Sequence, residues 1–243
     1  GAQDHGLIAC AKHFPGHGDT DTDSHKALPQ INHPFTRLDS LEMYPFKKLI
    51  DAGIGGVMVA HLNIPALDSS GVPSTLSKKI ISGILKEKLG FKGLIVTDAM
   101  NMKGVTTGNE PGVVDKKAII AGNDLLEFTE DVPKAIAEIR KAIDQGIISQ
   151  AAIDEKCRKV LAVKQWVGLN HYEPLKTANI DKELNNSYAE YIQQKLVEKS
   201  LTVLKNEQEL IPLRRLDTLK IASISIGADK KTAFQENLGW YTK

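Results

Sequence analysis

Short apolar runs and stretches with helical periodicity alternate along residues 1–145 of this chain. Continuous apolar runs of five or six residues are typical of buried strands, whereas apolar residues three and four apart indicate helices that face a core. The pattern predicts strands at residues 7–12, 56–61, 93–98 and 124–128, and helices at residues 36–52, 77–90, 115–121 and 132–145. It therefore predicts four successive β-loop-α units.

Polar residues near the helix ends refine these boundaries. Thr36 is positioned to cap the first helix, with Asp39 three residues later, although Pro45 indicates a kink or a later start. Ser77 is positioned to cap the second helix, and Gly90 to end it.

Strands that alternate with helices indicate a parallel sheet, because each helix returns the chain to the same edge. Both the alternation and the spacing suit a (β/α)8 barrel of the TIM type, which takes ~250 residues and eight units. Residues 1–169 supply about four β/α units, half of the eight that a full barrel needs. We therefore expect an α/β fold in which they form the second half of such a barrel. A doubly wound open sheet is the alternative.

The pattern changes after the fourth unit. A further helix is predicted at residues 149–169, with Ser149 as its cap, and a polar linker that contains Pro174 follows. A helix at 185–200 and a strand at 220–226 then indicate the opening of a second α/β domain. We expect the boundaries 1–169, 170–184 (linker) and 185–243.

Composition narrows the class of partner. The chain is 42% hydrophobic and 25% charged, its net charge is +1, and it contains no run of five like charges. Nucleic acid and anionic lipid are therefore not favoured as partners, whereas a neutral small molecule is favoured. No apolar run reaches the ~18 residues of a membrane span. Cys10 and Cys157 lack metal-binding spacing and are expected to be buried free thiols.

The segment after the first strand is the richest in chemically active side chains. It reads Lys-His-Phe-Pro-Gly-His-Gly from Lys12 to Gly18, and continues with Asp19, Asp21, Asp23, Ser24 and His25. Loops after barrel strands build active sites, and three histidines with three aspartates in thirteen residues indicate a functional site here.

Two chemistries fit this segment. A metal site would use His13, His17 and Asp19, but a four-residue spacing brings two histidines together on a helix, which the Pro-Gly pair breaks. A general acid/base pair would use Asp23 and His25, which face the same way in an extended stretch. A carboxylate bonded to an imidazole fixes its tautomer and favours its protonated form, giving an acid near neutral pH.

Asp98 ends the third predicted strand, within Val96-Thr97-Asp98-Ala99-Met100. The C-terminal end of a barrel strand faces the active-site mouth. A helix cap or a loop turn is the structural alternative for this residue. Glycosyl transfer with retention needs one carboxylate to attack the anomeric carbon and one acid to protonate the leaving oxygen, and this position suits the nucleophile.

Together these motifs resemble, in order and separation, the β-N-acetylglucosaminidase branch of the family-three glycoside hydrolases. The likeness covers residues 6–169, and the tail is similar to the start of the α/β sandwich domain that many members carry. The resemblance implies Asp98 as nucleophile, His25 as acid/base held by Asp23, and Lys12 and His13 as ligands of sugar hydroxyls. Members outside this branch take the acid/base from a glutamate in the second domain and lack the Asp-Ser-His loop.

The implied enzyme is a retaining exo-β-N-acetylglucosaminidase that hydrolyses terminal β-linked N-acetylglucosamine in peptidoglycan fragments or amino-sugar glycosides. Its partner is the carbohydrate. We expect no metal or organic cofactor, no nucleic acid, no membrane span and no obligate protein partner. His17, Met100 and His61 are further candidates for substrate contact; shaping the loop or packing are their alternative roles.

The resemblance also raises a departure and several rivals. Family members supply an acid and an arginine from upstream barrel strands, and these residues are absent from the chain, so we expect it not to form a complete sugar pocket alone. A phosphorylase that transfers N-acetylglucosamine to phosphate, a metal-dependent hydrolase and a non-catalytic binding module stay open. The resemblance favours the periplasm or cell envelope, with the cytoplasm as the alternative.

Overall fold

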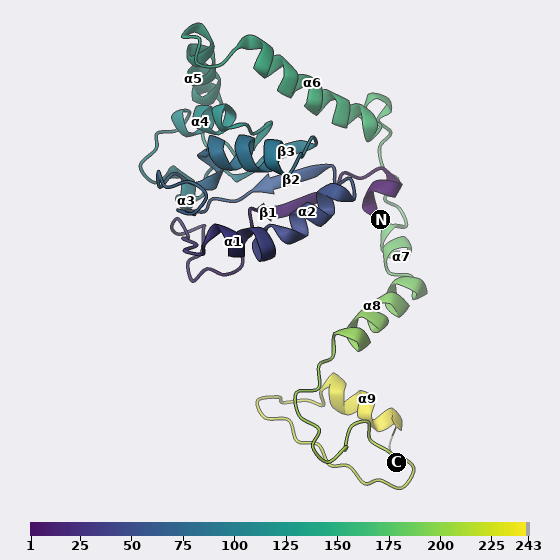
Figure 1. Ribbon diagram of the computed structural model, residues 1–243. Helices are drawn as coiled ribbons and strands as arrows, with labels where there is room; N and C mark the ends of the chain where they lie inside the picture. Colours follow the sequence, from purple (N-terminus) through teal and green to yellow (C-terminus); the bar gives the residue numbers. More distant parts are fainter. Residues whose placement is uncertain (242–243) are drawn as a thin grey trace. The chain divides into compact units, whose positions relative to one another are not determined.

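The computed structural model describes residues 1–241 and divides the chain into two compact units, Gly1–Glu173 and Pro174 onward (Figure 1). The first unit contains all the strands found among the described residues. It also contains every predicted site residue.

The four strands form one parallel sheet, and their order in the sheet follows their order in the sequence. They are β1 (Cys10–Phe14), β2 (Gly56–Val59), β3 (Leu94–Ala99) and β4 (Leu125–Glu127). Val57 lies opposite both Ala11 and Ile95, which sets the register at the centre of the sheet. The predicted parallel α/β architecture is therefore confirmed.

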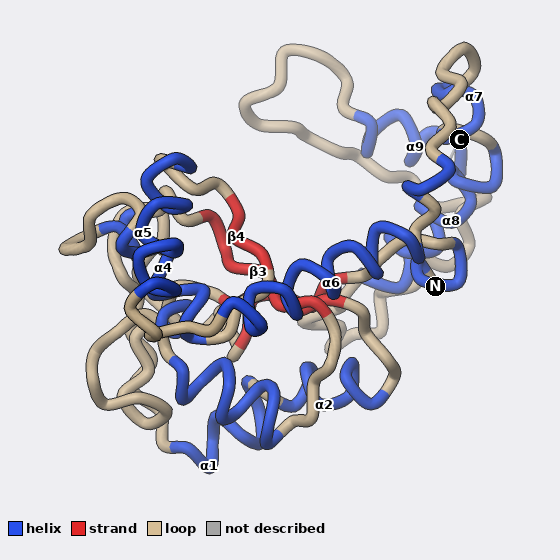
Figure 2. The backbone as a smooth tube through the Cα atoms, turned by 90° about the horizontal axis from the view of Figure 1, so that it is seen from above, coloured by secondary structure: helices blue, strands red, loops and turns tan. Residues whose placement is uncertain are grey.

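Helices connect and cover these strands (Figure 2). They are η1 (Ala2–His5), α1 (Phe35–Arg37), η2 (Leu38–Glu42), α2 (Tyr44–Asp51), η3 (Ser74–Leu76), η4 (Lys79–Lys88), α3 (Lys103–Thr106), α4 (Val113–Ala121), α5 (Val132–Asp144), α6 (Gln150–Trp166) and η5 (Leu169–His171). Helix α2 packs against β1, α6 against β3, and α4 against both β4 and α5.

The predicted helix 36–52 is divided into three pieces. Thr36 is not its cap, because the first turn already begins at Phe35, after Pro34 in an extended conformation. Helix α2 begins at Tyr44 with Pro45 in its first turn, which is the late start that this proline indicates. Two other caps are confirmed: Ser77 Oγ accepts from Ile80 N at 3.2 Å, and Ser149 Oγ accepts from Ala152 N at 3.1 Å.

The main core lies between the sheet and its helices. Its fully buried members include Val57, Val59, Ile80, Ile81, Leu85 and Ile95, each 0% exposed. Burying a side chain of this size contributes about 1.5–3 kcal/mol relative to leaving it in water. A second cluster, formed by Met100, Val105, Val114 and Ala118, packs α3 and α4 beneath the end of β3. The C-terminal end of β3 is thus packed against α3 and α4.

The second unit contains α7 (Ile180–Leu184), α8 (Ser187–Ser200) and α9 (Ala233–Tyr241). The predicted strand at 220–226 is wrong, because no strand forms between residues 174 and 241. Ile224 is 91% exposed and Ile226 is 98% exposed. Their apolar alternation is real, but a strand needs a neighbour for its backbone groups, and none pairs with this segment.

The two cysteines lie at the surface of the protein. Both cysteines are exposed free thiols, so the prediction of buried thiols is wrong. Cys10 begins an outer strand of the sheet, and Cys157 lies on the outward side of α6. Among residues 1–241, no helix is both long enough and apolar enough to cross a membrane.

Candidate active site

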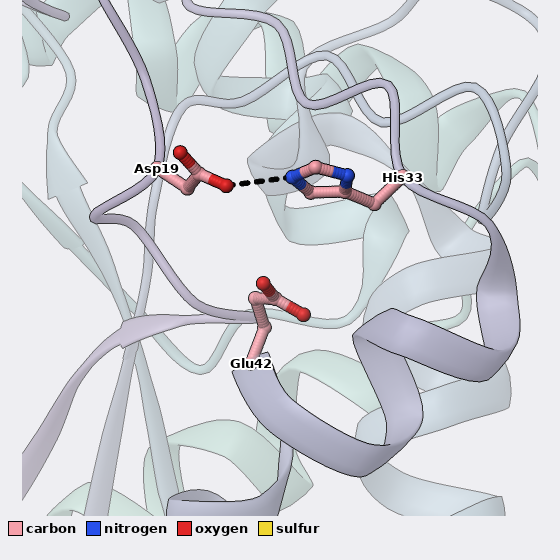
Figure 3. Close-up of side chains that lie close together, drawn as sticks. All are labelled: Asp19, His33 and Glu42. Carbon is pink, nitrogen blue, oxygen red and sulfur yellow. Dashed lines mark hydrogen bonds and ion pairs between the residues drawn. The ribbon is translucent and has the colours of Figure 1, made fainter.

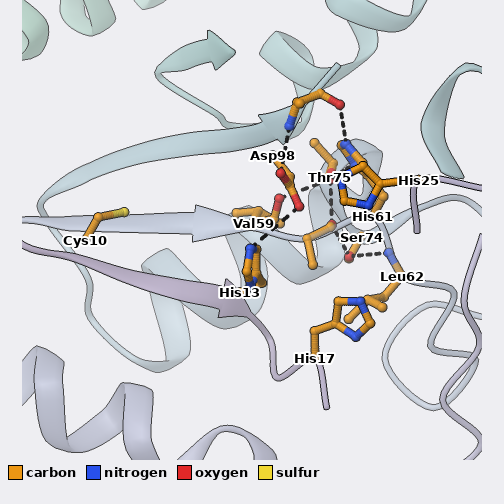
Figure 4. A network of polar contacts seen from close by, with 12 residues as sticks. Cys10, His13, His17, His25, Val59, His61, Leu62, Ser74, Thr75 and Asp98 are labelled. Carbon is orange, nitrogen blue, oxygen red and sulfur yellow. Dashed lines mark hydrogen bonds and ion pairs between the residues drawn. The ribbon is translucent and has the colours of Figure 1, made fainter. Parts of the chain in front are cut away.

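Asp98 and His13 meet at the C-terminal ends of β3 and β1 (Figure 4). His13 Nε2 lies 3.9 Å from Asp98 Oδ2, and Asp98 Oδ1 accepts the N–H of Ala99 at 2.8 Å. The Asp98 side chain is 17% exposed, so one carboxylate oxygen is fixed by the backbone while the group still reaches solvent. This geometry leaves Oδ2 beside His13 as the reactive face of the carboxylate.

His13 is held in its neutral form. Burial lowers the pKa of His13 below its ordinary value of 6.5, although the charge of Asp98 opposes that shift. At pH 7 the ring therefore carries one proton and acts as a neutral hydrogen-bond donor. His13 thus does not form a full ion pair with the Asp98 carboxylate.

The second acid–histidine pair lies on the long segment after β1, residues 15–33, here called the β1 loop. His25 Nδ1 lies 2.9 Å from Asp23 Oδ1, and that oxygen also accepts the N–H of His25 at 3.0 Å. The predicted contact is confirmed, but its basis differs, because the pair closes a turn rather than lying in an extended stretch. Both hydrogen bonds lower the pKa of Asp23, which therefore stays ionised in mild acid.

His61 lies behind Asp98 rather than at a pocket mouth, since its side chain is 0% exposed. Its Nε2 donates to the carbonyl of Ala99 at 3.0 Å, and its Nδ1 lies 2.6 Å from Thr75 Oγ1. Burial lowers the pKa of His61, so the ring is neutral, and because a carbonyl only accepts, Nε2 carries its proton. The expectation that His61 contacts substrate is not met; it supports the strand end next to Asp98.

Met100 is also removed from the surface. It is 1% exposed and belongs to the small core beneath β3. Its predicted substrate contact is therefore replaced by packing, because the turn after Asp98 directs this side chain inward against Val105 and Val114.

A hollow of about 370 Å³ brings Lys12, His13 and His17 together beside β1 and α2. His13 and His17 approach edge to face, with ring centroids 6.2 Å apart, and His17 Nδ1 lies 3.2 Å from Thr20 Oγ1. The hollow includes three predicted sugar ligands, but neither Asp98 nor His25 is part of its lining. Its wall is completed by apolar residues of η2 and α2: Leu41, Pro45, Phe46 and Leu49.

The predicted metal set of His13, His17 and Asp19 is not assembled in residues 1–241. Asp19 instead faces His33, with Asp19 Oδ2 and His33 Nε2 2.7 Å apart, and Glu42 lies nearby (Figure 3). The guanidinium of Arg37 donates to both Asp19 and Glu42 at 3.2 Å. The group carries its own cation, so we describe it as an ion-pair cluster that anchors the β1 loop to η2.

Sequence reasoning missed several residues of this region. Nothing in local spacing singles out His33, which is fourteen residues from Asp19, or Thr75, which is fourteen from His61. Gly104 is a third example: its N–H donates to the carbonyl of Ser24 in the β1 loop at 3.1 Å.

Known proteins resemble the part of the chain that contains these site residues. The family described as glycosyl hydrolase family 3 N terminal domain matches residues 1–163. A glycoside hydrolase family 3 β-N-acetylglucosaminidase from Paenibacillus sp. str. FPU-7 has a similar structure, with a TM-score of 0.77 and 36% identity. The alignment covers 84% of this chain and 39% of that one.

Two curated relatives agree with this likeness. Beta-hexosaminidase A of Pseudoalteromonas piscicida is 27% identical over 262 residues, covering 98% of this chain and 42% of its own length. A beta-hexosaminidase of Chromobacterium violaceum is 37% identical over 121 residues, covering 50% of this chain and 33% of its own length. The chain thus spans less than half the length of these relatives. Because the family match extends over most of the chain and includes both acid–histidine pairs, the chain belongs to glycosyl hydrolase family 3.

Proposed function

We propose that this chain carries the catalytic residues of a retaining exo-β-N-acetylglucosaminidase. The substrate would be terminal β-linked N-acetylglucosamine in peptidoglycan fragments or amino-sugar glycosides. The observation that carries the proposal is the Asp23–His25 contact of 2.9 Å on the β1 loop of a chain that also presents Asp98 at a strand end. The names of the relatives support the same activity.

In this mechanism Asp98 attacks the anomeric carbon and forms a covalent glycosyl-enzyme. The carboxylate is suited to this role because Oδ1 is held by the N–H of Ala99, which fixes the direction of Oδ2. His13 stays neutral beside it and so does not pair with the nucleophile as a full ion pair. Lys12 and His13, at the end of β1, would bind sugar hydroxyls, with His13 Nε2 3.9 Å from Asp98 Oδ2.

His25 supplies the proton. Protonated His25 gives its Nε2 proton to the departing glycosidic oxygen, and the neutral ring then takes a proton from the water that hydrolyses the glycosyl-enzyme. Asp23 accepts only, so it holds the Nδ1 proton and leaves Nε2 as the atom that exchanges protons. The proton count is the same at the start and at the end of the cycle.

The test uses the full-length gene product with aryl and alkyl N-acetylglucosaminides. Asp98→Ala should reduce turnover of both substrates by about 10³-fold or more, since covalent catalysis is lost. Proton NMR should show that the first-formed sugar is the β anomer. Near wild-type turnover by Asp98→Ala, or an α product, would show that the assigned nucleophile or the retaining mechanism is wrong.

His25→Ala should slow the alkyl glycoside by about 10²-fold and the nitrophenyl glycoside far less, because a good leaving group needs little protonation. His33→Ala is the matched control, since it removes a histidine–aspartate contact from the same loop without the proposed proton transfer. The control should show no dependence on the leaving group. An equal loss on both glycosides in His25→Ala would contradict the acid/base role.

The same assay separates the rivals. A phosphorylase would release a sugar phosphate and depend on added phosphate, whereas the proposed hydrolase turns over at the same rate without it. A metal-dependent hydrolase would lose activity with a chelator. We expect activity to survive chelation, because Asp19 is already paired with His33 and Arg37.

A further inference from the structure

The proposed function leaves open how the β1 loop, which is largely exposed at its tip, is held in place. We propose that Gly104 is a positioning residue: its N–H and its lack of a side chain form the seat on which the β1 loop docks. This inference rests on the proposed function for its catalytic meaning, but the docking itself does not depend on it.

The contact is made at the middle of the Asp-Ser-His motif. Gly104 N donates to the carbonyl of Ser24 at 3.1 Å, and Ser24 is only 6% exposed. The side chains on either side stand out into solvent, since that of Asp23 is 50% exposed and that of His25 is 75% exposed. The Asp-Ser-His motif is therefore held through its backbone at Ser24, while both members of the acid/base pair stay accessible.

Close approach explains why glycine occupies this position. A Cβ atom at residue 104 would lie 3.0 Å from the carbonyl oxygen of Ser24 and 3.2 Å from that of Ala27. Both atoms are backbone, so the loop would have to move to accommodate even a methyl group. Gly104 lies in helix α3 and has no left-handed φ, so the local backbone conformation itself does not require glycine.

The seat is connected to the nucleophile. The same Cβ would lie 3.4 Å from His61 Cβ, so Gly104 rests between the β1 loop and His61. His61 in turn donates to the carbonyl of Ala99, the residue next to Asp98 (Figure 4). Gly104 is therefore bonded to the loop and lies beside His61, which is bonded to the end of β3. A shift of the seat would change the position of His25 relative to Asp98.

Hydrogen exchange on this chain tests the docking without any assay of activity. In Gly104→Ala, amides of the β1 loop that close its turn, those of Lys26 and Ala27, should exchange about tenfold faster than in the wild type. Gly83→Ala is the matched control, because a Cβ there meets nothing within 4 Å. It should leave loop exchange unchanged. Wild-type loop exchange in a folded Gly104→Ala protein would overturn the proposal.

The wild type alone decides the question if Gly104→Ala does not fold. The amide of Gly104 should be protected, and across a urea series it should open together with those of Lys26 and Ala27. Opening of Gly104 at its unprotected rate, while the amides of β2 and β3 stay protected, would show that no seat forms.

Kinetics of the full-length gene product then test the positioning role. Gly104→Ala should lower kcat on an alkyl N-acetylglucosaminide about tenfold, with much less effect on the nitrophenyl substrate and on KM. That is a weaker form of the expected His25→Ala signature. A loss of equal size on both substrates would overturn the positioning role. Absence of glycosidase activity in the wild type would refute the proposed function, and the exchange result would still decide the docking.

Discussion

One oxygen of Asp23 binds His25 twice: Oδ1 lies 2.9 Å from the ring Nδ1 and accepts the backbone N–H of the same residue at 3.0 Å. The second bond closes a turn that holds the first in place, so the pair is preorganised by only three consecutive residues. Because a carboxylate only accepts, the ring is fixed in the tautomer that carries its proton on Nδ1.

Asp23→Asn should keep the turn but lose the carboxylate that accepts the Nδ1 proton of His25. We expect kcat/KM for an alkyl N-acetylglucosaminide to fall by about 10²-fold, within the range of general acid–base effects. Asp21→Asn removes the same charge from the same loop and is the control. Steady-state kinetics of the two variants side by side check the prediction, and equal losses would contradict it.

His61→Ala should destabilise the fold. The residue is 0% exposed, and its removal leaves a cavity and takes away one of the two N–H donors to the Ala99 carbonyl, the other being Met102 N. Together these costs amount to about 2–4 kcal/mol in the free energy of unfolding. Urea denaturation followed by circular dichroism measures the change. Thr75→Ser, which keeps the hydroxyl beside Nδ1, should lose much less, and a His61→Ala midpoint equal to that of the wild type would refute this account.

Gly16→Ala should displace the base of the β1 loop. Gly16 has φ +135°, and a Cβ there would lie 2.6 Å from Glu42 Cβ and 3.0 Å from the Glu42 carbonyl oxygen. Overpacking together with the unfavourable φ should lower the free energy of unfolding by about 2–4 kcal/mol. Gly18→Ala offers a control two residues away, where a Cβ meets nothing within 4 Å. Thermal melts that put both variants at the same midpoint would disprove the effect.

Asp68 should make the free energy of unfolding depend on pH in the acid range. Burial acts to raise the pKa of Asp68, but hydrogen bonds from Ser77, Ser70 and Lys79 outweigh it and lower that pKa from 3.8 to about 2. Since the folded-state pKa is depressed, the stabilisation is present above about pH 4 and is lost as the pH falls through about 2.

At pH 7, Asp68→Asn should therefore unfold at a lower urea concentration than the wild type. Its free energy of unfolding should be lower by about 1–3 kcal/mol, because hydrogen bonds to a charged group are lost. The difference should shrink toward pH 2. Asp144→Asn, on an exposed side chain at the end of α5, should show no such convergence. A gap between Asp68→Asn and wild type that stays constant from pH 7 to pH 2 would contradict the assigned pKa.

The sequence predicted the strands well because parallel strands are buried on both faces, so Val57, Val59 and Ile95 stand out as apolar runs. The boundaries of β1 shifted to Cys10–Phe14 because the strand carries Lys12 and His13 within it. The apolar pattern detects buried residues, so it does not detect the part of a strand that carries polar site residues.

The candidate site was predictable only where it is local in sequence. Asp23 and His25 meet within one turn, and Asp98 ends an apolar run, so both signals can be recognised along the chain. Partners that depend on the path of the β1 loop, such as His33 for Asp19 and Gly104 for Ser24, follow only from three-dimensional coordinates. The prediction of a strand at 220–226 was wrong although its local pattern is apolar, because no neighbouring strand pairs with this segment.

The order β1-β2-β3-β4 has a mechanical consequence for the residues that it presents. His13 lies on an outer strand, and Asp98 lies two strands further in. Among the described residues, β2 is the one strand between the two that carry His13 and Asp98. The β1–β2 and β2–β3 pairings therefore set the separation between His13 and Asp98, and α2 packs against β1 from one side.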